Sequence, residues 1–436
     1  MSNTTEFIES HALPSILVEI DSINLLARLK ALGAIGRNVD GELVRLAASI
    51  EDKAGRDQLV QWFEDAGLGI SIDRIGNIFG TWCGDLAGQP LMLGSHIDTV
   101  INAGTLDGSY GVLAGLAVVE AMQLAKLQPD RPVIIAAFTN EEGVRYMPDM
   151  MGSLVYSGGL EISKALATIG TDGSVLGEAL QQISYAGDIQ PGSVIPHAFI
   201  ELHVEQGPVL EVENLNIGAV ANLQGISWQR ISISGVANHA GTTPTHMRAD
   251  AGLVAARINT FLRDEIVGKS MTTVATVGTM KLSPDAINVI PDGAIFTVDL
   301  RDPDEVVLQA VEVKLQDYLK KLQDAGNISI TSERLARFEP VQFDTDLVAS
   351  IEDAALKAGH SCRRMTSGAG HDAQMMARIC PSAMIFVPSR DGISHNPLEH
   401  TDDTALVAGA NVLLGVALDL CGCEQAGDQS AIVKET

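Results

Sequence analysis

Apolar residues recur along the chain in two patterns, a helical spacing and short continuous runs. The helical spacing predicts helices over residues 41–67, 110–127 and 404–420. The continuous runs predict strands at residues 70–72, 78–81, 91–93 and 132–138. The last run is unbroken, which is typical of a strand buried in a parallel sheet. Strands that alternate with helices in this way predict an α/β domain on a mixed sheet.

A second unit is visible within the chain, and its pattern is complete in itself. Strand-like runs occur at residues 228–234, 272–280, 294–300 and 328–331, with helical spacing at 250–262 and 303–322. The resulting order, β-α-β-β-α-β, is that of the ferredoxin-like split βαβ sandwich. A chain of 436 residues is also longer than one core usually supports. We therefore predict a discontinuous first domain, residues 1–222 and 338–436, and an inserted domain, residues 223–337.

Composition excludes several classes of protein. The net charge of −26, from 29 basic and 55 acidic residues, opposes binding to a nucleic-acid backbone. The five cysteines form no C-x-x-C pair, so we expect reduced thiols and a cytoplasmic location. Residues 1–14 lack the basic and apolar regions of a signal peptide. The apolar stretch 404–420 contains Asn411 and Asp419, so we expect a buried helix and no membrane span.

Histidines and carboxylates cluster at predicted strand ends and turns. They are His96, Asp98, Asp107, Glu141, Glu142, His203 and His395. In an α/β sheet such ends converge at one edge, where ligand sites lie. A single motif of this kind is more often incidental, but this many at strand ends predict a site. Imidazole and carboxylate ligands without cysteine suit Zn²⁺, Mn²⁺ or Co²⁺.

The spacing of these residues suggests individual roles. His96 and Asp98 are two apart, so in an extended segment Asp98 could accept the second N–H of His96 and orient a metal ligand. Asp107 lies in a turn before Gly108, where one carboxylate could bridge two ions. Of the adjacent Glu141 and Glu142, one could bind metal while the other acts as a general base. The chain has no H-E-x-x-H, G-x-S-x-G or Walker A motif, which disfavours a serine hydrolase or a nucleotide enzyme.

Five segments together resemble a known family. They are residues 94–99 (GSHIDT), 139–143 (TNEEG), 201–208 (ELHVEQGP), 238–244 (NHAGTTP) and 394–397 (SHNP). They are similar to the hydantoinase/carbamoylase branch of the dinuclear metallo-aminoacylase and carboxypeptidase superfamily. That branch includes N-carbamoyl-L-amino-acid amidohydrolases, allantoate amidohydrolases and beta-ureidopropionases. The resemblance extends from about residue 40 to residue 420.

The resemblance implies a role for each matching residue. It implies two divalent ions per subunit, with Asp107 as the bridging ligand and Glu141 as the general base. The implied metal ligands are His96, Asp107, Glu142, His203 and His395. The implied substrate contacts are Gln206, Asn288, Arg301 and His371. It also implies a homodimer formed by the inserted lid or dimerisation domain, in which His239 reaches the reacting carbonyl in the other subunit.

For three of these residues the sequence itself leaves two readings open. The guanidinium of Arg301 suits a substrate carboxylate, but an ion pair with Asp302 or Asp304 is equally compatible. His239 could donate to a developing oxyanion or stabilise a turn. His371 could contact substrate or lie in an exposed loop.

These observations predict a metal-dependent amidohydrolase. We expect it to cleave the carbamoyl C–N bond of an N-carbamoyl-L-amino acid, giving the amino acid, CO₂ and ammonia. Allantoate amidohydrolase and beta-ureidopropionase are the alternatives, followed by an N-acyl amino acid amidohydrolase and a non-catalytic metal-binding scaffold. The expected partner is a small substrate with a carboxylate, with no nucleic acid and no membrane.

Overall fold

The computed structural model describes residues 18–423, which form two compact units. Unit 1 contains residues 18–219, 345–364 and 371–423 of this range, and unit 2 contains residues 220–344 and 365–370. The short segment 365–370 is linked to the rest of unit 2 by two hydrogen bonds that its backbone carbonyls accept. Gln224 N donates to Ser367 O at 3.2 Å, and Arg301 Nη1 donates to Gly368 O at 2.8 Å. The fold is mixed α/β, as predicted.

The larger sheet has nine strands, in the order β1-β2-β4-β3-β5-β15-β6-β13, with β14 paired to β6. The strands are β1 (Gly69–Ile72), β2 (Ile78–Trp82), β3 (Leu91–His96), β4 (Val133–Phe138), β5 (Ala198–Val204), β6 (Ile217–Leu223), β13 (Val341–Gln342), β14 (Cys362–Ser367) and β15 (Ser382–Val387). Four neighbouring strands, β4, β3, β5 and β15, run parallel, while β2 pairs antiparallel with β4. Their carboxyl ends therefore meet at one edge of the sheet.

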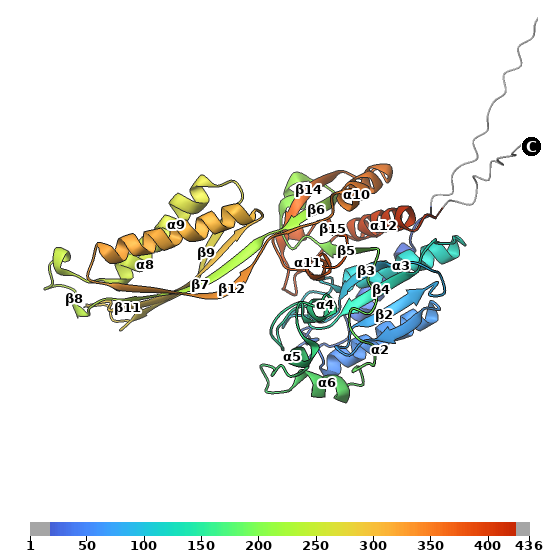
Figure 1. Cartoon of the computed structure of the whole chain (residues 1–436), viewed down its shortest axis with the longest axis horizontal. Helices are drawn as coiled ribbons and strands as arrows, with labels where there is room; N and C mark the ends of the chain where they lie inside the picture. Colours follow the sequence, from blue (N-terminus) through green and yellow to red (C-terminus); the bar gives the residue numbers. More distant parts are fainter. Residues whose placement is uncertain (1–17, 424–436) are drawn as a thin grey trace, which may run out of the picture. The chain divides into compact units, whose positions relative to one another are not determined.

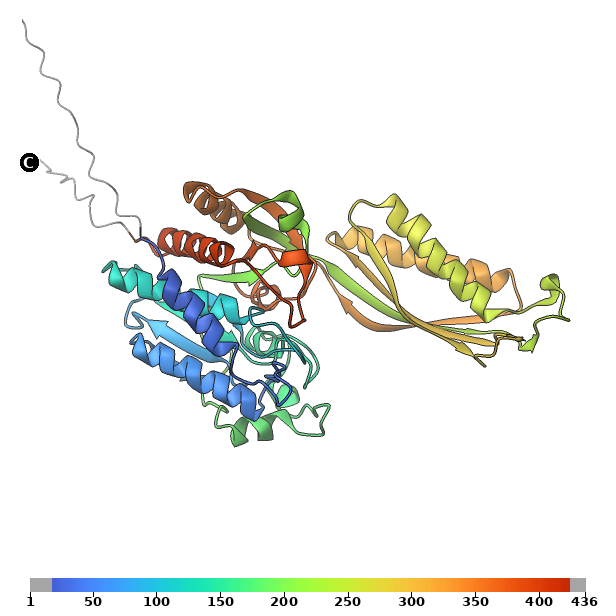
Figure 2. The ribbon, with the colours of Figure 1, turned by 180° about the vertical axis from the view of Figure 1, so that it is seen from behind.

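Helices cover both faces of the parallel strands. One layer consists of α1 (Ser22–Leu32), α3 (Ser109–Leu124), α10 (Thr345–Lys357) and α12 (Asp403–Leu420). Figure 2 shows α1, α3 and α12 side by side. The short helices α4 (Met151–Tyr156) and α11 (Asp372–Met376) also contact these strands and each other. The remaining helices of unit 1 are α2 (Ile50–Asp65), α5 (Ile162–Leu166), α6 (Leu176–Gln182), α7 (Val209–Glu213) and the 3-10 turn η4 (Arg390–Gly392).

Helix α12 is long and apolar enough to cross a membrane, judged by length and composition alone. Half of this stretch is buried inside the protein. It packs against α3, α10, β5 and β15. These contacts are those of a core helix, which agrees with the expectation from Asn411 and Asp419.

Unit 2 has its own four-stranded antiparallel sheet, in the order β12-β7-β11-β9. Its main elements are β7 (Gly225–Ser234), α8 (Ala251–Phe261), β9 (Val274–Ser283), β11 (Gly293–Asp302), α9 (Glu305–Asp324) and β12 (Ser329–Phe338). Figure 1 shows α8 and α9 together on one face of this sheet, where they bury a core that includes Ile231, Ile258, Phe296 and Leu315. The chain order is the predicted β-α-β-β-α-β. Smaller elements are β8 (Asn238–His239), paired with β10 (Val289–Ile290), and the turns η1 (Thr245–Met247), η2 (Leu262–Ile266) and η3 (Val267–Lys269).

The helix predicted over residues 41–67 is shorter than expected. Helix α2 begins at Ile50, with Ser49 as its N-cap accepting from Asp52 N at 3.0 Å. Residues before the cap are irregular, and Leu43 forms isolated bridges to Arg37 and Ala103. The apolar side chains there are buried by tertiary contacts, so their spacing resembled a helix without requiring one.

Gly94 in β3 allows the close approach of β4 and provides a stability test. A Cβ atom at this position would lie 2.2 Å from the carbonyl oxygen of Ala136. Replacing Gly94 by Ala should therefore lower the free energy of unfolding by about 1–3 kcal/mol, the usual cost of overpacking, in urea titrations followed by circular dichroism.

The matched control is Gly69→Ala in β1, where the nearest atom, Thr81 O, lies 3.8 Å from the added Cβ. This change should alter the free energy of unfolding by less than about 0.5 kcal/mol. Equal losses in the two variants would contradict the steric explanation for Gly94.

Candidate metal centre

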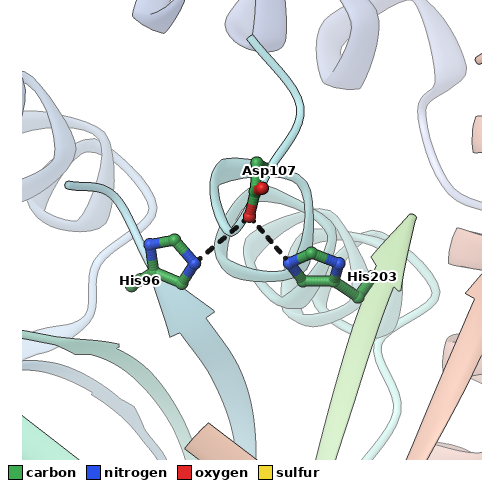
Figure 3. Close-up of side chains that lie close together, drawn as sticks. All are labelled: His96, Asp107 and His203. Carbon is green, nitrogen blue, oxygen red and sulfur yellow. Dashed lines mark ion pairs between the residues drawn. The ribbon is translucent and has the colours of Figure 1, made fainter. Parts of the chain in front are cut away.

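Asp107 lies at the centre of the site, in the loop between β3 and α3. Its Oδ1 atom lies 3.4 Å from His96 Nε2 and 3.1 Å from His203 Nε2, and Figure 3 shows the two imidazoles pointing at it. Its Oδ2 atom lies 3.2 Å from His395 Nε2. His395 Nε2 is in turn 3.5 Å from Glu142 Oε2. Each oxygen of this one carboxylate therefore faces a different set of candidate ligands.

The structure thus contains two candidate metal sets that share Asp107. One is His96, Asp107 and His203, and the other is Asp107, Glu142 and His395; the ligand atoms of each set lie within 4.8 Å of one another. The five residues come from the carboxyl ends of β3 and β5, from the turn after β4, and from the loops before α3 and α12. The parallel strands bring these segments to one edge of the sheet.

The tautomers of two histidines can be assigned from their partners. His96 Nδ1 lies 2.9 Å from the Asp98 carbonyl oxygen, and His203 Nδ1 lies 2.8 Å from the Val204 carbonyl oxygen. Because a carbonyl only accepts, each Nδ1 must carry the proton. In the neutral form of each ring, Nε2 therefore carries the lone pair and faces Asp107. The Gly108 N–H, which donates to His203 Nε2 at 3.1 Å, agrees with this assignment.

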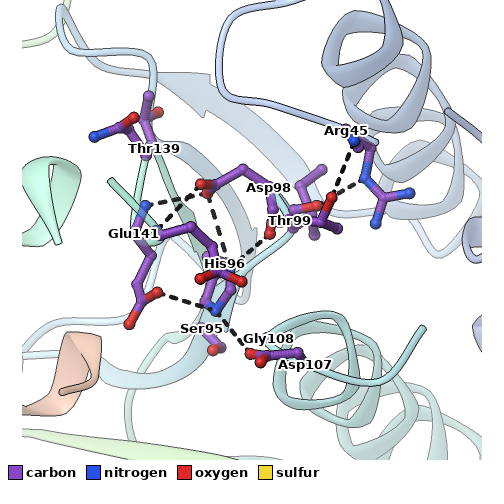
Figure 4. Close-up of polar contacts among 12 residues, drawn as sticks. Arg45, Ser95, His96, Asp98, Thr99, Asp107, Gly108, Thr139 and Glu141 are labelled. Atoms are coloured by element: carbon purple, nitrogen blue, oxygen red, sulfur yellow. Dashed lines mark hydrogen bonds and ion pairs between the residues drawn. The ribbon is translucent and has the colours of Figure 1, made fainter. Parts of the chain in front are cut away.

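The Asp98 carboxylate does not accept the N–H of His96, although the sequence predicts that it does. Its carboxylate Oδ1 is 3.8 Å from His96 Nδ1, so the hydrogen bond goes to the backbone carbonyl instead. The carboxylate accepts from Glu141 N at 3.1 Å (Figure 4). It also accepts from Glu142 N at 3.3 Å. The prediction assumed an extended segment, but β3 ends at His96. Asp98 therefore holds the turn that carries the two glutamates.

The side chains fit divalent cations. Among the described residues, the buried atoms His96 Nε2 and Glu142 Oε1 have no hydrogen-bond partner. Burial, followed by the charge of Asp107, raises the pKa of Glu142 to about 8. Orphaned ligand atoms beside several buried carboxylates are costly unless a cation compensates them. The donor set of imidazole nitrogens and carboxylate oxygens is one that Zn²⁺, Mn²⁺ and Co²⁺ accept.

The charge of Asp107 is retained by its histidine neighbours. Burial alone would raise the pKa of Asp107, but its contacts with His203, His395 and His96 hold that pKa well below its usual range. In return, the hydrogen bond to Asp107 raises the pKa of His395 to about 9. Asp107 is thus an ionised candidate ligand. The neighbouring carboxylates also raise the pKa values of His96 and His203 despite burial, so all three histidines must lose a proton to bind a metal.

Glu141 is the candidate base. Its carboxylate is buried, with Oε2 3.5 Å from His96 Nε2 (Figure 4). Burial raises its pKa well above the usual range, and the carboxylates of Asp372, Glu142 and Asp107 add to this effect. A raised pKa makes a carboxylate a stronger proton acceptor.

Gln206 and His371 lie beside this cluster. Gln206 Nε2 donates to Asp107 Oδ2 at 2.8 Å, while its buried Oε1 has no partner among the described residues. His371 is buried against His203, with ring centroids 4.5 Å apart, and its Nε2 also lacks a described partner. The exposed-loop reading of His371 is therefore wrong. Burial, followed by the charge of His203, holds its pKa well below the usual range, so this imidazole stays neutral.

The other three predicted residues, His239, Asn288 and Arg301, lie in unit 2. His239 and Asn288 are exposed, and Asn288 O accepts from Ala240 N at 3.0 Å. His239 Nδ1 accepts from Gly241 N at 3.0 Å and from Thr242 N at 3.2 Å. These contacts stabilise the turn, and they also leave the proton on Nε2, so both readings of His239 remain compatible with the structure.

Arg301 is held by an ion pair with a different aspartate from those predicted. Its Nη2 lies 2.9 Å from Asp299 Oδ2, and its Nε lies 3.1 Å from both carboxylate oxygens. The alternative pairing with Asp302 or Asp304 is wrong. Asp302 accepts from threonine hydroxyls, and Asp304 caps α9.

The sequence reasoning missed several acids beside the candidate ligands. They are Glu201 and Asp372, which are buried, and Glu399, which is half-buried. Glu201 accepts from Ser95 Oγ at 2.6 Å and from Ala373 N at 2.8 Å. Together with His203 and His371 it forms a third group of close ligand-type atoms. A signal for Glu201 existed, because it precedes His203 by two residues in a strand and so shares its face.

Comparisons with known proteins show the family to which this chain belongs. Peptidase family M20/M25/M40, a metal-dependent family, matches residues 92–419. The N-carbamoyl-L-amino-acid amidohydrolase of Rhizobium meliloti is 36% identical over 409 residues, covering 94% of this chain and 98% of the relative. The allantoate amidohydrolase of Escherichia coli is 33% identical over 386 residues, covering 88% and 94%.

Similarity to solved structures indicates the same family. A hydantoinase/carbamoylase family amidase from Burkholderia multivorans is 38% identical, with a TM-score of 0.90, covering 93% of this chain and 99% of that one. The matches in sequence and in structure extend over nearly the whole chain. The chain therefore belongs to peptidase family M20/M25/M40, in its hydantoinase/carbamoylase branch.

Proposed function

We propose that this protein is a metal-dependent amidohydrolase acting on N-carbamoyl-L-amino acids, with the amino acid, CO₂ and ammonia as products. The observation that carries the proposal is the single carboxylate of Asp107 between two sets of ligands, with Glu141 beside them. Several relatives named N-carbamoyl-L-amino-acid amidohydrolases, 32–36% identical, support this substrate class.

In this proposal His96, Asp107 and His203 hold one divalent ion, and Asp107, Glu142 and His395 hold a second. Zn²⁺, Mn²⁺ and Co²⁺ are the candidate metals. When bound, such ions polarise a carbonyl group and lower the pKa of water. Glu141 then takes a proton from water at its carboxylate and passes it to the leaving nitrogen of the substrate.

The remaining roles concern substrate binding. We infer that Arg301 binds the substrate carboxylate, because its guanidinium is already fixed by Asp299 and still has free N–H groups. The unpartnered Oε1 of Gln206 and Nε2 of His371 are suited to substrate amide groups. Asn288 and His239 complete the set, with His239 Nε2–H as the donor to the carbonyl oxygen in a homodimer formed through the inserted domain.

We also propose that the protein is cytoplasmic and that its partner is a small substrate with a carboxylate. All five cysteines are free thiols in the structure. The net charge of −26 disfavours nucleic acid.

A second candidate is hydrolysis of allantoate or a related ureido compound. The relatives support it, because they include the allantoate amidohydrolase of Escherichia coli and a ureidoglycolate hydrolase of Arabidopsis thaliana, 33% and 32% identical. Beta-ureidopropionase activity is a further alternative, since it would use the same cluster.

The test is ammonia release from a substrate panel in the presence of Mn²⁺. The panel contains N-carbamoyl-L-amino acids, their D-enantiomers, N-carbamoyl-beta-alanine and allantoate, with release of free amino acid measured for N-acetyl-L-amino acids. We expect the largest kcat/KM for an N-carbamoyl-L-amino acid. Activity confined to allantoate or to N-carbamoyl-beta-alanine would transfer the proposal to that substrate, and activity on none of them would refute it.

Replacing Glu141 by Gln tests the general base. The change keeps the size of the side chain but removes its basicity, so we expect kcat to fall by a factor of about 10² to 10⁴. Metal content, measured by atomic emission, should stay at the wild-type level because Glu141 is outside both ligand sets.

The neighbouring change Glu142→Gln is the matched control. It should lower the metal content, because Glu142 belongs to the second ligand set. An active Glu141→Gln enzyme, or one that lacks metal, would contradict the division of roles between the two glutamates.

The raised pKa of His395 predicts a pH-dependent affinity for metal. His395 keeps its proton below pH 9, because its contact with Asp107 raises its pKa to about 9. A ligand must be deprotonated, so the affinity of the stripped protein for Mn²⁺ should rise between pH 6.5 and 9, by about tenfold per pH unit for one displaced proton. Titration calorimetry in buffers of different ionisation enthalpy would count the protons released. An affinity that is flat over this range would contradict the prediction.

A further inference from the structure

Glu399 is a half-buried carboxylate outside both ligand sets that contacts two segments carrying ligands. Its Oε2 atom accepts from Leu106 N at 2.8 Å and from Asp107 N at 3.3 Å. Its Oε1 atom accepts from the hydroxyl of Ser394, the residue before His395, at 2.9 Å. One side chain thus joins the loop of the bridging ligand to the loop of the last histidine, which is distant in sequence.

The loop before Asp107 packs closely on Glu399. A Cβ atom at Gly104 would lie 2.2 Å from Glu399 Oε2 and 2.4 Å from Glu399 Cβ. Only glycine leaves room for the carboxylate at this point. The position of Glu399 is therefore set by the surrounding backbone.

The hydroxyl of Ser394 has one proton and two carboxylates within reach. Glu399 Oε1 lies 2.9 Å from Ser394 Oγ, whereas Asp107 Oδ2 lies 3.3 Å away. The shorter contact indicates that the proton points to Glu399. Gln206 Nε2, 3.3 Å from Ser394 Oγ, donates to the lone pair on the other side of this oxygen.

We propose that Glu399 is a positioning residue that holds the Ser394 proton away from Asp107 Oδ2. Because Asp107 Oδ2 already accepts from Gln206 Nε2 at 2.8 Å, this keeps its remaining lone pair free for the cation that it would share with Glu142 and His395. The inference rests on the proposed metal centre. It explains why the carboxylate of Glu399 lies next to Asp107 without belonging to either ligand set.

The variant Glu399→Gln should reverse the hydrogen bond without removing the side chain. The amide oxygen of Gln can still accept from the two backbone N–H groups, but its NH₂ group would donate to Ser394 Oγ. Ser394 would then turn its proton to Asp107 Oδ2 and compete with the metal. We expect the affinity for the second Mn²⁺ to fall by about tenfold, the usual scale of one hydrogen bond to a charged group.

The double variant Glu399→Gln/Ser394→Ala separates this effect from a simple loss of charge. Without the hydroxyl there is no proton to donate, so the double variant should regain most of the lost affinity. A loss caused only by the missing negative charge would remain. Glu312→Gln in unit 2 is the matched control, because Glu312 also accepts from a buried serine hydroxyl, Ser227 Oγ, far from the ligand sets in sequence. It should bind Mn²⁺ like the wild type.

The experiment is a calorimetric titration of Mn²⁺ into each chelator-stripped protein, with the unfolding temperature of the stripped protein as a check of folding. The inference is supported if Glu399→Gln weakens the second ion and the double variant restores it. It is overturned if the affinity of Glu399→Gln matches that of the wild type, or if the double variant stays as weak as the single one.

Ser394→Ala alone gives a second test that keeps Glu399 intact. If the Ser394 proton already lies on Asp107 in the wild type, removing it should tighten Mn²⁺ binding, and such tightening would overturn the inference. A wild-type protein that binds no Mn²⁺ would instead refute the metal centre, and with it both the proposed function and this inference.

Discussion

The structure of the site depends on the carboxylate of Asp107, whose two oxygens contact two different sets of candidate ligands. Asp107 directs Oδ1 to His96 and His203 and Oδ2 to His395. Its charge is retained in a buried position because histidines surround it, although the neighbouring Glu141 and Glu142 are acids whose pKa values are raised by burial. Several ionised acids buried side by side are costly unless cations compensate their charge. The positions of the ligands follow from that requirement.

The fold meets this requirement through the parallel strands. β3, β4 and β5 end at the same edge, and each supplies or precedes a ligand or the base. Several groups outside the ligand sets then fix the ligands. Two backbone carbonyls set the tautomers of His96 and His203, and the Asp98 carboxylate orders the turn with Glu141 and Glu142. Precise placement of ligands by such neighbours is general in metal sites.

Much of this could be predicted from the sequence, because the signals are local. The unbroken apolar run before Thr139 predicts β4, and the strand-like runs and helical spacing predict the β-α-β-β-α-β order of unit 2. The candidate metal ligands could be named because each lies at a strand end or in a turn, and because the motifs around them resemble those of a known family. In contrast, residues 41–49 have a helical spacing that reflects tertiary burial, so pattern alone placed the start of α2 too early.

The features that could not be predicted are those made by contacts distant in sequence. Glu399 accepts from the backbone of a loop 293 residues earlier, and Asp372 accepts from the hydroxyl of Ser153, 219 residues earlier. Nothing in the sequence around either residue specifies such a partner. The pairing of Arg301 with Asp299 could have been found, because residues two apart in a strand share one face.

The central claim is that one carboxylate joins two metal ions, and electron paramagnetic resonance of the Mn²⁺-loaded protein tests it most directly. Two ions that share Asp107 must lie close enough for their spins to couple. We predict that the spectrum at full loading is that of a coupled Mn²⁺ pair, and that Asp107→Asn abolishes the coupling. A spectrum of isolated Mn²⁺ ions at every loading would contradict the account.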